Sequence, residues 1–173
     1  VRRPAGTEVR ARRAAGMRAG RGEGVTDAMT LLEAPFREGR LARPEGPVAV
    51  LGARPGGGFE GWDLRCEQGF RPDHDALLAE GRAASPELSG EGFAAALVVA
   101  ARSREETLGR IARAWEMAAE GAAVVVAGAK TDGIEGRQRA LRRAPAPAGV
   151  AVEALAMGHG RAVWTHRRGA APP

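Results

Sequence analysis

Two glycine-rich segments have residue types that could hold a phosphate or a nucleotide. Gly52 to Gly58 reads Gly-Ala-Arg-Pro-Gly-Gly-Gly and follows an apolar segment, where open α/β sheets place a ligand-binding turn. The spacing is not G-x-G-x-x-G, and Pro55 and the missing middle glycine oppose close approach of a ligand. We predict a flexible turn, with a self-contained nucleotide-binding site that uses this turn and Glu67 as the alternative.

The second segment, Gly128 to Gly133, contains Gly-Ala-Lys-Thr-Asp-Gly and superficially resembles a P-loop. The spacing G-x-x-x-x-G-K-[ST] is not met, because Ala123 stands where the first glycine is required and a residue separates glycine from lysine. ATP hydrolysis is not expected. A Thr-Asp-Gly turn that caps a helix beginning near Ile134 explains most of the segment, and Lys130 is a candidate phosphate contact.

Histidine and cysteine give no complete site. His74 lies between two aspartates, but neighbouring side chains on a helix point apart, so the triplet is a poor chelate. His159, between two glycines, is typical of a tight turn. Cys66 is the sole cysteine, which excludes an intrachain disulfide and favours a reducing compartment. We predict a cytoplasmic protein with no catalytic residue, no bound cofactor and no metal site.

Positive charge is concentrated at the N-terminus. Residues 1–24 hold seven arginines and two glutamates, whereas the other 149 residues hold 19 basic and 19 acidic groups. The first 24 residues also lack apolar periodicity, which predicts a disordered arginine-rich tail. No apolar run approaches the roughly 20 residues that cross a bilayer, so no membrane partner is expected.

Apolar periodicity predicts alternating strands and helices over residues 25–168. Strands are expected at 47–53, 63–67, 93–100, 122–128, 150–155 and 161–165, and helices at 26–36, 73–80, 103–119 and 134–143. The runs at 93–100 and 122–128 are continuously apolar, as in parallel sheets with helices on both faces. The fold class is therefore α/β: one domain with a mostly parallel sheet and an antiparallel pair of strands at its edge.

Two helices carry specific start signals. Thr26 is the expected N-cap of the first helix. Ser103 is the expected N-cap of the third, with Glu106 at capping-box spacing. The predicted inner face of this third helix consists of Leu108, Ile111, Ala112, Trp115 and Ala119.

Four segments resemble bacterial class I S-adenosylmethionine-dependent methyltransferases of the small-subunit ribosomal RNA guanine-N2 type. They are Phe70 to Asp75, Ala95 to Val98, Gly128 to Ile134 and Gly158 to Arg161. The resemblance runs from Thr26 to Thr165 and corresponds to the N-terminal half of the family protein. It implies a degenerate Rossmann-like domain, because in that family a second domain binds S-adenosylmethionine and carries the chemistry.

The family's catalytic motifs are absent from this sequence. Its cofactor turn has an acidic-Gly-x-Gly-x-Gly pattern, and an Asn-Pro-Pro-Phe/Tyr loop orients the target amine. The sequence has no asparagine, and its one Pro-Pro is Pro172-Pro173. The resemblance thus implies an inactive fragment or truncated product, with 169–173 as a tail or the start of a linker to a missing catalytic domain.

The leading hypothesis is a non-catalytic scaffold or RNA-placing domain of a ribosomal RNA methyltransferase. Its RNA-contact candidates are Lys130, Arg161, Arg167 and Arg168. A third hypothesis is an RNA-binding module driven by the arginines of residues 1–24, which predicts steep salt dependence.

Overall fold

The computed structural model describes residues 27–143 and 151–169. The predicted tail at residues 1–24, the predicted cap Thr26 and part of the predicted strand at 150–155 lie outside the described residues.

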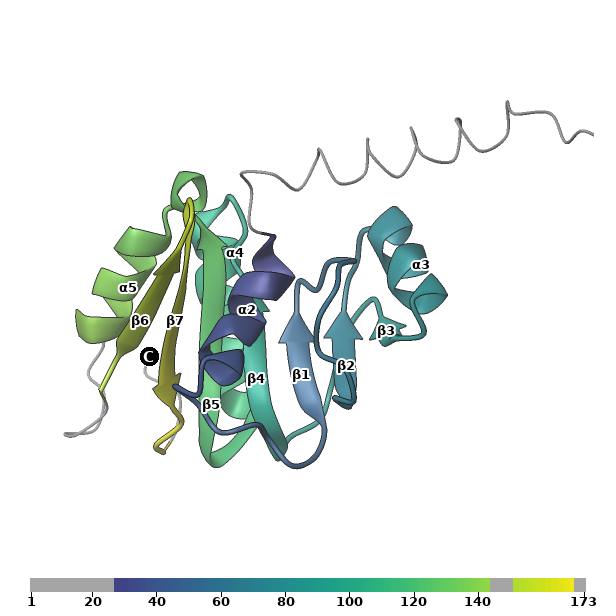
Figure 1. The fold of residues 1–173 in the computed structure, drawn as a ribbon, viewed down its shortest axis with the longest axis horizontal. Helices are drawn as coiled ribbons and strands as arrows, with labels where there is room; N and C mark the ends of the chain where they lie inside the picture. Colours follow the sequence, from purple (N-terminus) through teal and green to yellow (C-terminus); the bar gives the residue numbers. More distant parts are fainter. Residues whose placement is uncertain (1–26, 144–150, 170–173) are drawn as a thin grey trace, which may run out of the picture.

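Seven strands form one sheet in the order β3-β2-β1-β4-β5-β7-β6 (Figure 1). Strands β1 to β5 are parallel, and β7 pairs antiparallel with both β5 and β6. The bounds are β1 Val48–Leu51, β2 Leu64–Glu67, β3 Ala83–Ser85, β4 Phe93–Val99, β5 Ala118–Ala129, β6 Glu153–Met157 and β7 Gly160–His166. The predicted α/β class, mostly parallel sheet and antiparallel edge pair are confirmed.

Helices cover both faces of the sheet. On one face lie α2 (Ala28–Arg37), across β4, β5 and β7, and α3 (Arg71–Ala79) beside β3. On the other face lie α4 (Arg104–Met117) and α5 (Ile134–Arg143). A short 3-10 helix, η1 (Lys130–Asp132), joins β5 to α5.

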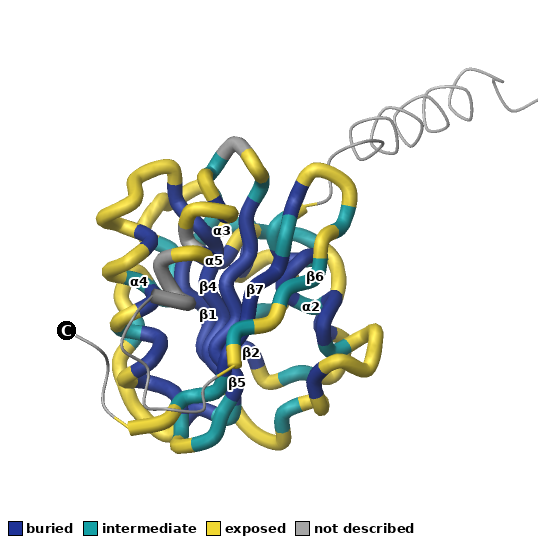
Figure 2. The backbone as a smooth tube through the Cα atoms, turned by 90° about the vertical axis from the view of Figure 1, so that its left-hand side faces the viewer, coloured by how far each residue is buried: buried dark blue, intermediate teal, exposed yellow. Residues whose placement is uncertain are grey.

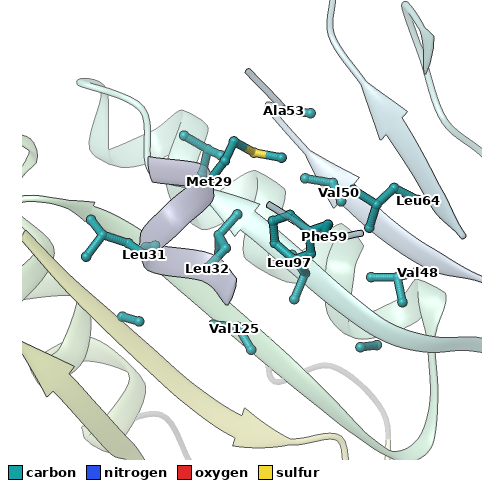
Figure 3. Close-up of a cluster of buried hydrophobic side chains, with 14 of the residues drawn as sticks. Met29, Leu31, Leu32, Val48, Val50, Ala53, Phe59, Leu64, Leu97 and Val125 are labelled. Carbon is teal, nitrogen blue, oxygen red and sulfur yellow. The ribbon is translucent and has the colours of Figure 1, made fainter. Parts of the chain in front are cut away.

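Side chains of each central strand alternate between two cores, as the two-residue period of a strand requires. Val48 and Val50 of β1 face α2, whereas Ala49 and Leu51 face α4. Met29, Leu31 and Leu32 from α2 pack onto the first of these cores (Figure 3). In Figure 2 the central strands are buried and the exposed residues lie mainly in loops and on outer helix surfaces. The buried sheet is a rigid support for the loops at its ends.

The connection from β1 to β2 is irregular. Parallel neighbours are usually joined through a helix, but residues 52–63, all of which are described, contain none. Instead Phe59 is buried against the α2-side core, and Trp62 packs edge-on against Phe36 and Phe59 at 5.0 Å between ring centroids. Phe59 has a φ of 61°, a left-handed conformation that burial of its ring must offset.

The predicted inner face of α4 was partly wrong. Leu108 and Ala112 are exposed, while Thr107, Ile111, Ala114 and Trp115 are buried. The Thr107 hydroxyl donates to Ala101 O and accepts from Ala101 N–H, so a polar residue occupies the inner face. The predicted cap is confirmed, since Ser103 Oγ accepts from the Glu106 N–H.

Two boundaries and one short strand also differ from expectation. Asp27 accepts the Thr30 N–H and is the N-cap of α2. The short strand β3 was not predicted, because three residues without large apolar side chains carry no alternation signal. Ala119 belongs to β5, which follows α4 directly.

Within the described ranges, no helix is long and apolar enough to cross a membrane.

Candidate functional site

The point between β1 and β4 is where an open α/β sheet places a ligand. The connections from these neighbouring strands run to opposite sides, and ligands of such sheets bind outside the carboxyl ends of the strands at this switch point. Gly52 directly follows β1, and its φ of 73° requires a residue without a Cβ. The first predicted glycine segment therefore has the position of a cofactor turn.

Arg110 of α4 fills the space beside this turn. A Cβ added at Gly52 would lie 2.7 Å from Arg110 Cζ. The guanidinium is fixed on both sides: Nη1 donates to Val99 O at 2.8 Å and Nη2 to Glu106 Oε1 at 2.6 Å. The glycine thus accommodates an arginine of the same chain.

Glu67, the predicted alternative ligand at the end of β2, is also engaged internally. Its two carboxylate oxygens accept from Arg113 at 2.7 and 2.6 Å, and Oε2 accepts the Leu88 N–H at 2.7 Å. Burial would raise the pKa of Glu67, but the hydrogen bonds from Arg113 and Leu88, with the charges of Arg113 and Arg110, outweigh it and leave this pKa below its ordinary value. Glu67 is therefore an ionised partner of α4.

The rest of the glycine segment is held by residues near the end of α3. The Gly56 N–H donates to Glu80 Oε1 at 3.1 Å, and Arg82 Nη2 donates to Gly56 O at 2.7 Å and to Gly58 O at 3.2 Å. The predicted flexible turn is therefore tied to neighbouring elements by hydrogen bonds. Its backbone groups are in part already paired.

A second group of predicted residues lies at the carboxyl end of β5. Lys130 is exposed at the start of η1. Arg161 of β7 is half-buried opposite Gly128; it donates to Gln138 of α5 and lies 3.6 Å from Glu135 Oε1. Lys130 and Arg161 therefore share one end of the sheet. The turn containing Asp132 was predicted to cap the helix that begins at Ile134. In the structure the Asp132 carboxylate instead accepts the Ala129 N–H, ahead of η1.

Arg167 and Arg168 lie at the opposite end of β7. His166, the last residue of β7, pairs with Ala123 of β5, five residues from the Gly128 pairing. Arg167 Nη1 donates to the carbonyls of Glu116 and Ala118, so it holds the junction of α4 and β5. Arg168 is exposed. The four predicted RNA contacts are thus divided between the two ends of the sheet.

The remaining candidates form no recognisable centre. His74 Nδ1 lies 3.4 Å from Asp75 Oδ1 at the start of α3. No group of three His, Cys, Asp or Glu that could hold a metal occurs among residues 27–143 and 151–169. Cys66 is buried, and burial raises the pKa of its thiol to about 11, so it is a core residue with little thiolate.

Arg110 and Arg113 were missed by the sequence interpretation. They lie three residues apart on α4 and therefore point in similar directions. This helix follows β4, so its first turns lie near the switch point. The sequence did contain a signal for them, namely two arginines three residues apart on the helix that follows β4.

Known proteins resemble this chain in structure rather than in sequence. No protein-family model and no curated protein matches the sequence. Among solved structures, the T. thermophilus 16S rRNA N2 G1207 methyltransferase (RsmC), in complex with AdoMet and guanosine, has a TM-score of 0.65 at 20% identity. A TehB-like SAM-dependent methyltransferase from Corynebacterium glutamicum has a TM-score of 0.58 at 15% identity, and a putative rRNA-methylase from Clostridium thermocellum 0.55 at 13%. The fold is that of SAM-dependent methyltransferases.

The matched lengths differ between these structures. The match covers 96% of this chain and 100% of the C. glutamicum protein, and 84% and 98% for the C. thermocellum protein. It covers 87% of this chain but 42% of the T. thermophilus protein, so this chain spans less than half the length of that methyltransferase.

At the switch point, where the fold would hold S-adenosylmethionine, the space beside the first turn is taken by side chains of the chain itself. Arg110 lies where a ligand would approach Gly52, and both oxygens of Glu67 are bound by Arg113. A ligand at this point would have to displace two guanidinium groups from paired positions.

Proposed function

We propose that this chain is a non-catalytic methyltransferase-like domain of a ribosomal RNA guanine-N2 methyltransferase, corresponding to its N-terminal half, and that it helps to place RNA for a separate catalytic domain. The observation that carries the proposal is the position of Arg110 against Gly52. A fold that ordinarily binds its cofactor at this point has here a side chain of its own, paired on both sides.

The likeness to ribosomal RNA methylases supports an RNA partner for the domain. The T. thermophilus enzyme acts on 16S rRNA, and its chain is more than twice as long as the part that matches here. A second domain in the same enzyme would supply the cofactor and the catalytic groups that this one lacks.

The carboxyl end of β5 is the favoured RNA surface. Lys130 is exposed there, and the sequence of α5, IEGRQRALRR, contains four arginines and one glutamate. Glu135 lies 3.6 Å from Arg161 Nη2, which offsets the one negative charge of the helix. A local excess of cations on a domain without net charge fits contacts to phosphates, which position RNA without reading its sequence.

The single lysine of the chain makes this surface testable. An amine-reactive reagent can modify only Lys130 and the N-terminal amine, and mass spectrometry distinguishes the two. We expect a small-subunit rRNA fragment to protect Lys130 from modification at low salt, with protection lost as salt increases. Deletion of residues 1–24 should leave the protection in place; protection that disappears with the tail would favour the arginine-rich tail as the RNA-binding element.

A self-contained nucleotide site at Gly52 to Gly58 gains no support from the geometry. The turn's partners are Arg110, Glu80 and Arg82, and Glu67 is held by Arg113.

A further inference from the structure

The most exposed large apolar side chain of the described residues lies at the start of α3. Phe70 is 62% exposed, whereas Leu78 and Leu108, at 48% and 37%, have no ring. The backbone of Phe70 is held in place, because its N–H donates to Gln68 Oε1 at 2.8 Å and its carbonyl accepts the His74 N–H at 3.0 Å. A fixed backbone therefore presents an aromatic ring to solvent.

This ring lies at the carboxyl end of the sheet, the end where Lys130 is exposed. Strands β1, β2, β4 and β5 are parallel, so the connections that follow them leave from one end of the sheet (Figure 1). Each of these four connections has an exposed arginine or lysine close behind its strand. In strand order across the sheet they are Arg71 after β2, Arg54 after β1, Arg102 after β4 and Lys130 after β5.

Two of these cations lie on the segments next to the ring. Arg71 follows Phe70 directly in sequence. Arg54 belongs to the β1–β2 connection, and Gln68 joins this connection to the start of α3. The Gln68 side chain accepts the Phe70 N–H through Oε1 and donates through Nε2 to Ala53 O at 2.7 Å. Ala53 directly precedes Arg54, so the two segments are tied together.

The row of cations is available to a partner. Among the described side chains, none forms an ion pair with Arg54, Arg102 or Lys130. Arg71 lies 3.7 Å from Asp75, an exposed pair of the kind that contributes little. Three strand spacings, about 14 Å, separate β2 from β5, so an extended polyanion can contact both sides of this end.

We propose that the carboxyl end of the sheet binds single-stranded RNA, with one unpaired base stacked on Phe70 and the phosphates following the cations from Arg71 to Lys130. Proteins that bind single strands without reading sequence combine a cationic track with aromatic side chains on which bases stack. A protein partner would instead favour a contiguous apolar patch, and the segments beside this ring carry arginine. A duplex keeps its bases stacked in pairs and offers the ring no free base.

This inference rests on the proposed function, because it takes RNA as the partner and extends the surface at Lys130 across the sheet. It adds that the bound RNA is unpaired, and that an aromatic ring rather than a charge distinguishes it from a duplex.

The test compares the affinity for a fluorescently labelled single-stranded oligoribonucleotide with that for the same strand annealed to its complement, by fluorescence anisotropy. Phe70→Leu removes the ring, keeps an apolar side chain and spares the fold, because this side chain is exposed. We expect it to weaken binding of the single strand by about tenfold, as for the loss of one base–aromatic stack, and to leave duplex binding unchanged. Phe70→Tyr, which retains a ring, should keep the original affinity.

Leu78→Ala is the matched control. Leu78 is also exposed on α3, but it lies about 12 Å from Phe70 along the helix axis, toward the other end of the sheet. This substitution should leave both affinities unchanged. Arg54→Gln should reduce the slope of log affinity against log salt for the single strand by about 0.7, as expected for one phosphate contact.

The outcomes distinguish this inference from the proposed function. If rRNA protects Lys130 but Phe70→Leu binds the single strand as tightly as the unmodified protein, the inference fails and the proposed function stands. An equal loss for single strand and duplex, or an equal loss in Leu78→Ala, would also overturn the inference, because the ring would then act through the fold. Absence of Lys130 protection together with no binding of either RNA would overturn both.

Discussion

The carboxyl end of the sheet differs between its two halves. After β1 and β2, Gly52 and Glu67 occupy positions suited to a ligand, but Arg110 and Arg113 of α4 occupy the space and pair with their neighbours. After β5, Lys130 is exposed beside a helix rich in arginine. At the first half the turn keeps the backbone geometry of a binding turn, while the side chains beside it are paired within the chain.

Removal of Arg113 tests whether its ion pair with Glu67 stabilises the fold. Arg113→Met leaves the carboxylate of Glu67, which is 13% exposed, without its ion-pair partner. We expect a loss of about 2 kcal/mol in the free energy of unfolding, the range for a buried polar group left unsatisfied. Urea denaturation measures it. A loss below about 0.5 kcal/mol, the usual range for surface substitutions, would show that the pair is not structural.

Low pH should weaken the same ion pair, between Glu67 and Arg113, and lower the stability of the fold. The folded-state pKa of Glu67 lies below its ordinary value of 4.5, so its contribution to stability is present above that pH and is lost as pH falls through the lower folded value. Glu67→Gln should therefore show a weaker fall in stability over that acid range than the unmodified protein. Denaturation midpoints measured at successive pH values provide the comparison; parallel curves would contradict it.

Gly52→Ala should have an effect of similar size. A residue with a Cβ at φ 73° costs about 1–2 kcal/mol, and the added group also displaces Arg110. In the Arg110→Ala background the displacement disappears and the backbone cost remains, so the substitution should be less damaging there. An equal loss in both backgrounds would mean that Arg110 does not fill the turn.

Charge reversal at Lys130 tests the proposed RNA surface at the carboxyl end of β5. Lys130→Glu should lower rRNA affinity and reduce the slope of log affinity against log salt by about 1, as expected for one phosphate contact. Filter binding over a salt series measures both quantities. Arg168→Glu, an equal charge change at the opposite end of β7, is the control, and a larger effect there would move the RNA surface.

Gly57→Asp is expected to have the smallest effect. Gly57 is exposed, has no positive φ, and an added Cβ would have nothing within 4 Å. Stability should stay within about 0.5 kcal/mol of the unmodified protein, as for surface substitutions generally. RNA affinity should fall only by the nonspecific cost of one negative charge. Loss of a nucleotide ligand from an intact fold would instead favour the glycine-turn alternative.

The sequence predicted the sheet better than the site. Continuous apolar runs such as Phe93 to Ala100 identify buried parallel strands because both faces need apolar side chains. Strand β3 was missed because a short edge strand needs no apolar pattern. Arg110 and Arg113 were missed because Glu67 lies 46 residues from Arg113 in sequence and Gly52 lies 58 residues from Arg110. Spacing along one helix does not identify such distant neighbours.

The four RNA-contact candidates illustrate the same limit. Arg161 and Arg167 are six residues apart on or beside one strand, yet their hydrogen bonds lie at opposite ends of the sheet. Strand length separates residues by about 3.3 Å each, so closeness in sequence does not form a patch.

Calorimetric titration with S-adenosylmethionine shows whether the switch point of this domain binds the cofactor. The described arrangement predicts no binding heat for the unmodified protein at cofactor concentrations up to the millimolar range, with the C. glutamicum SAM-dependent methyltransferase of the same fold as positive control. Saturable binding at micromolar concentration would contradict the claim that Arg110 and Arg113 have replaced the cofactor at the switch point.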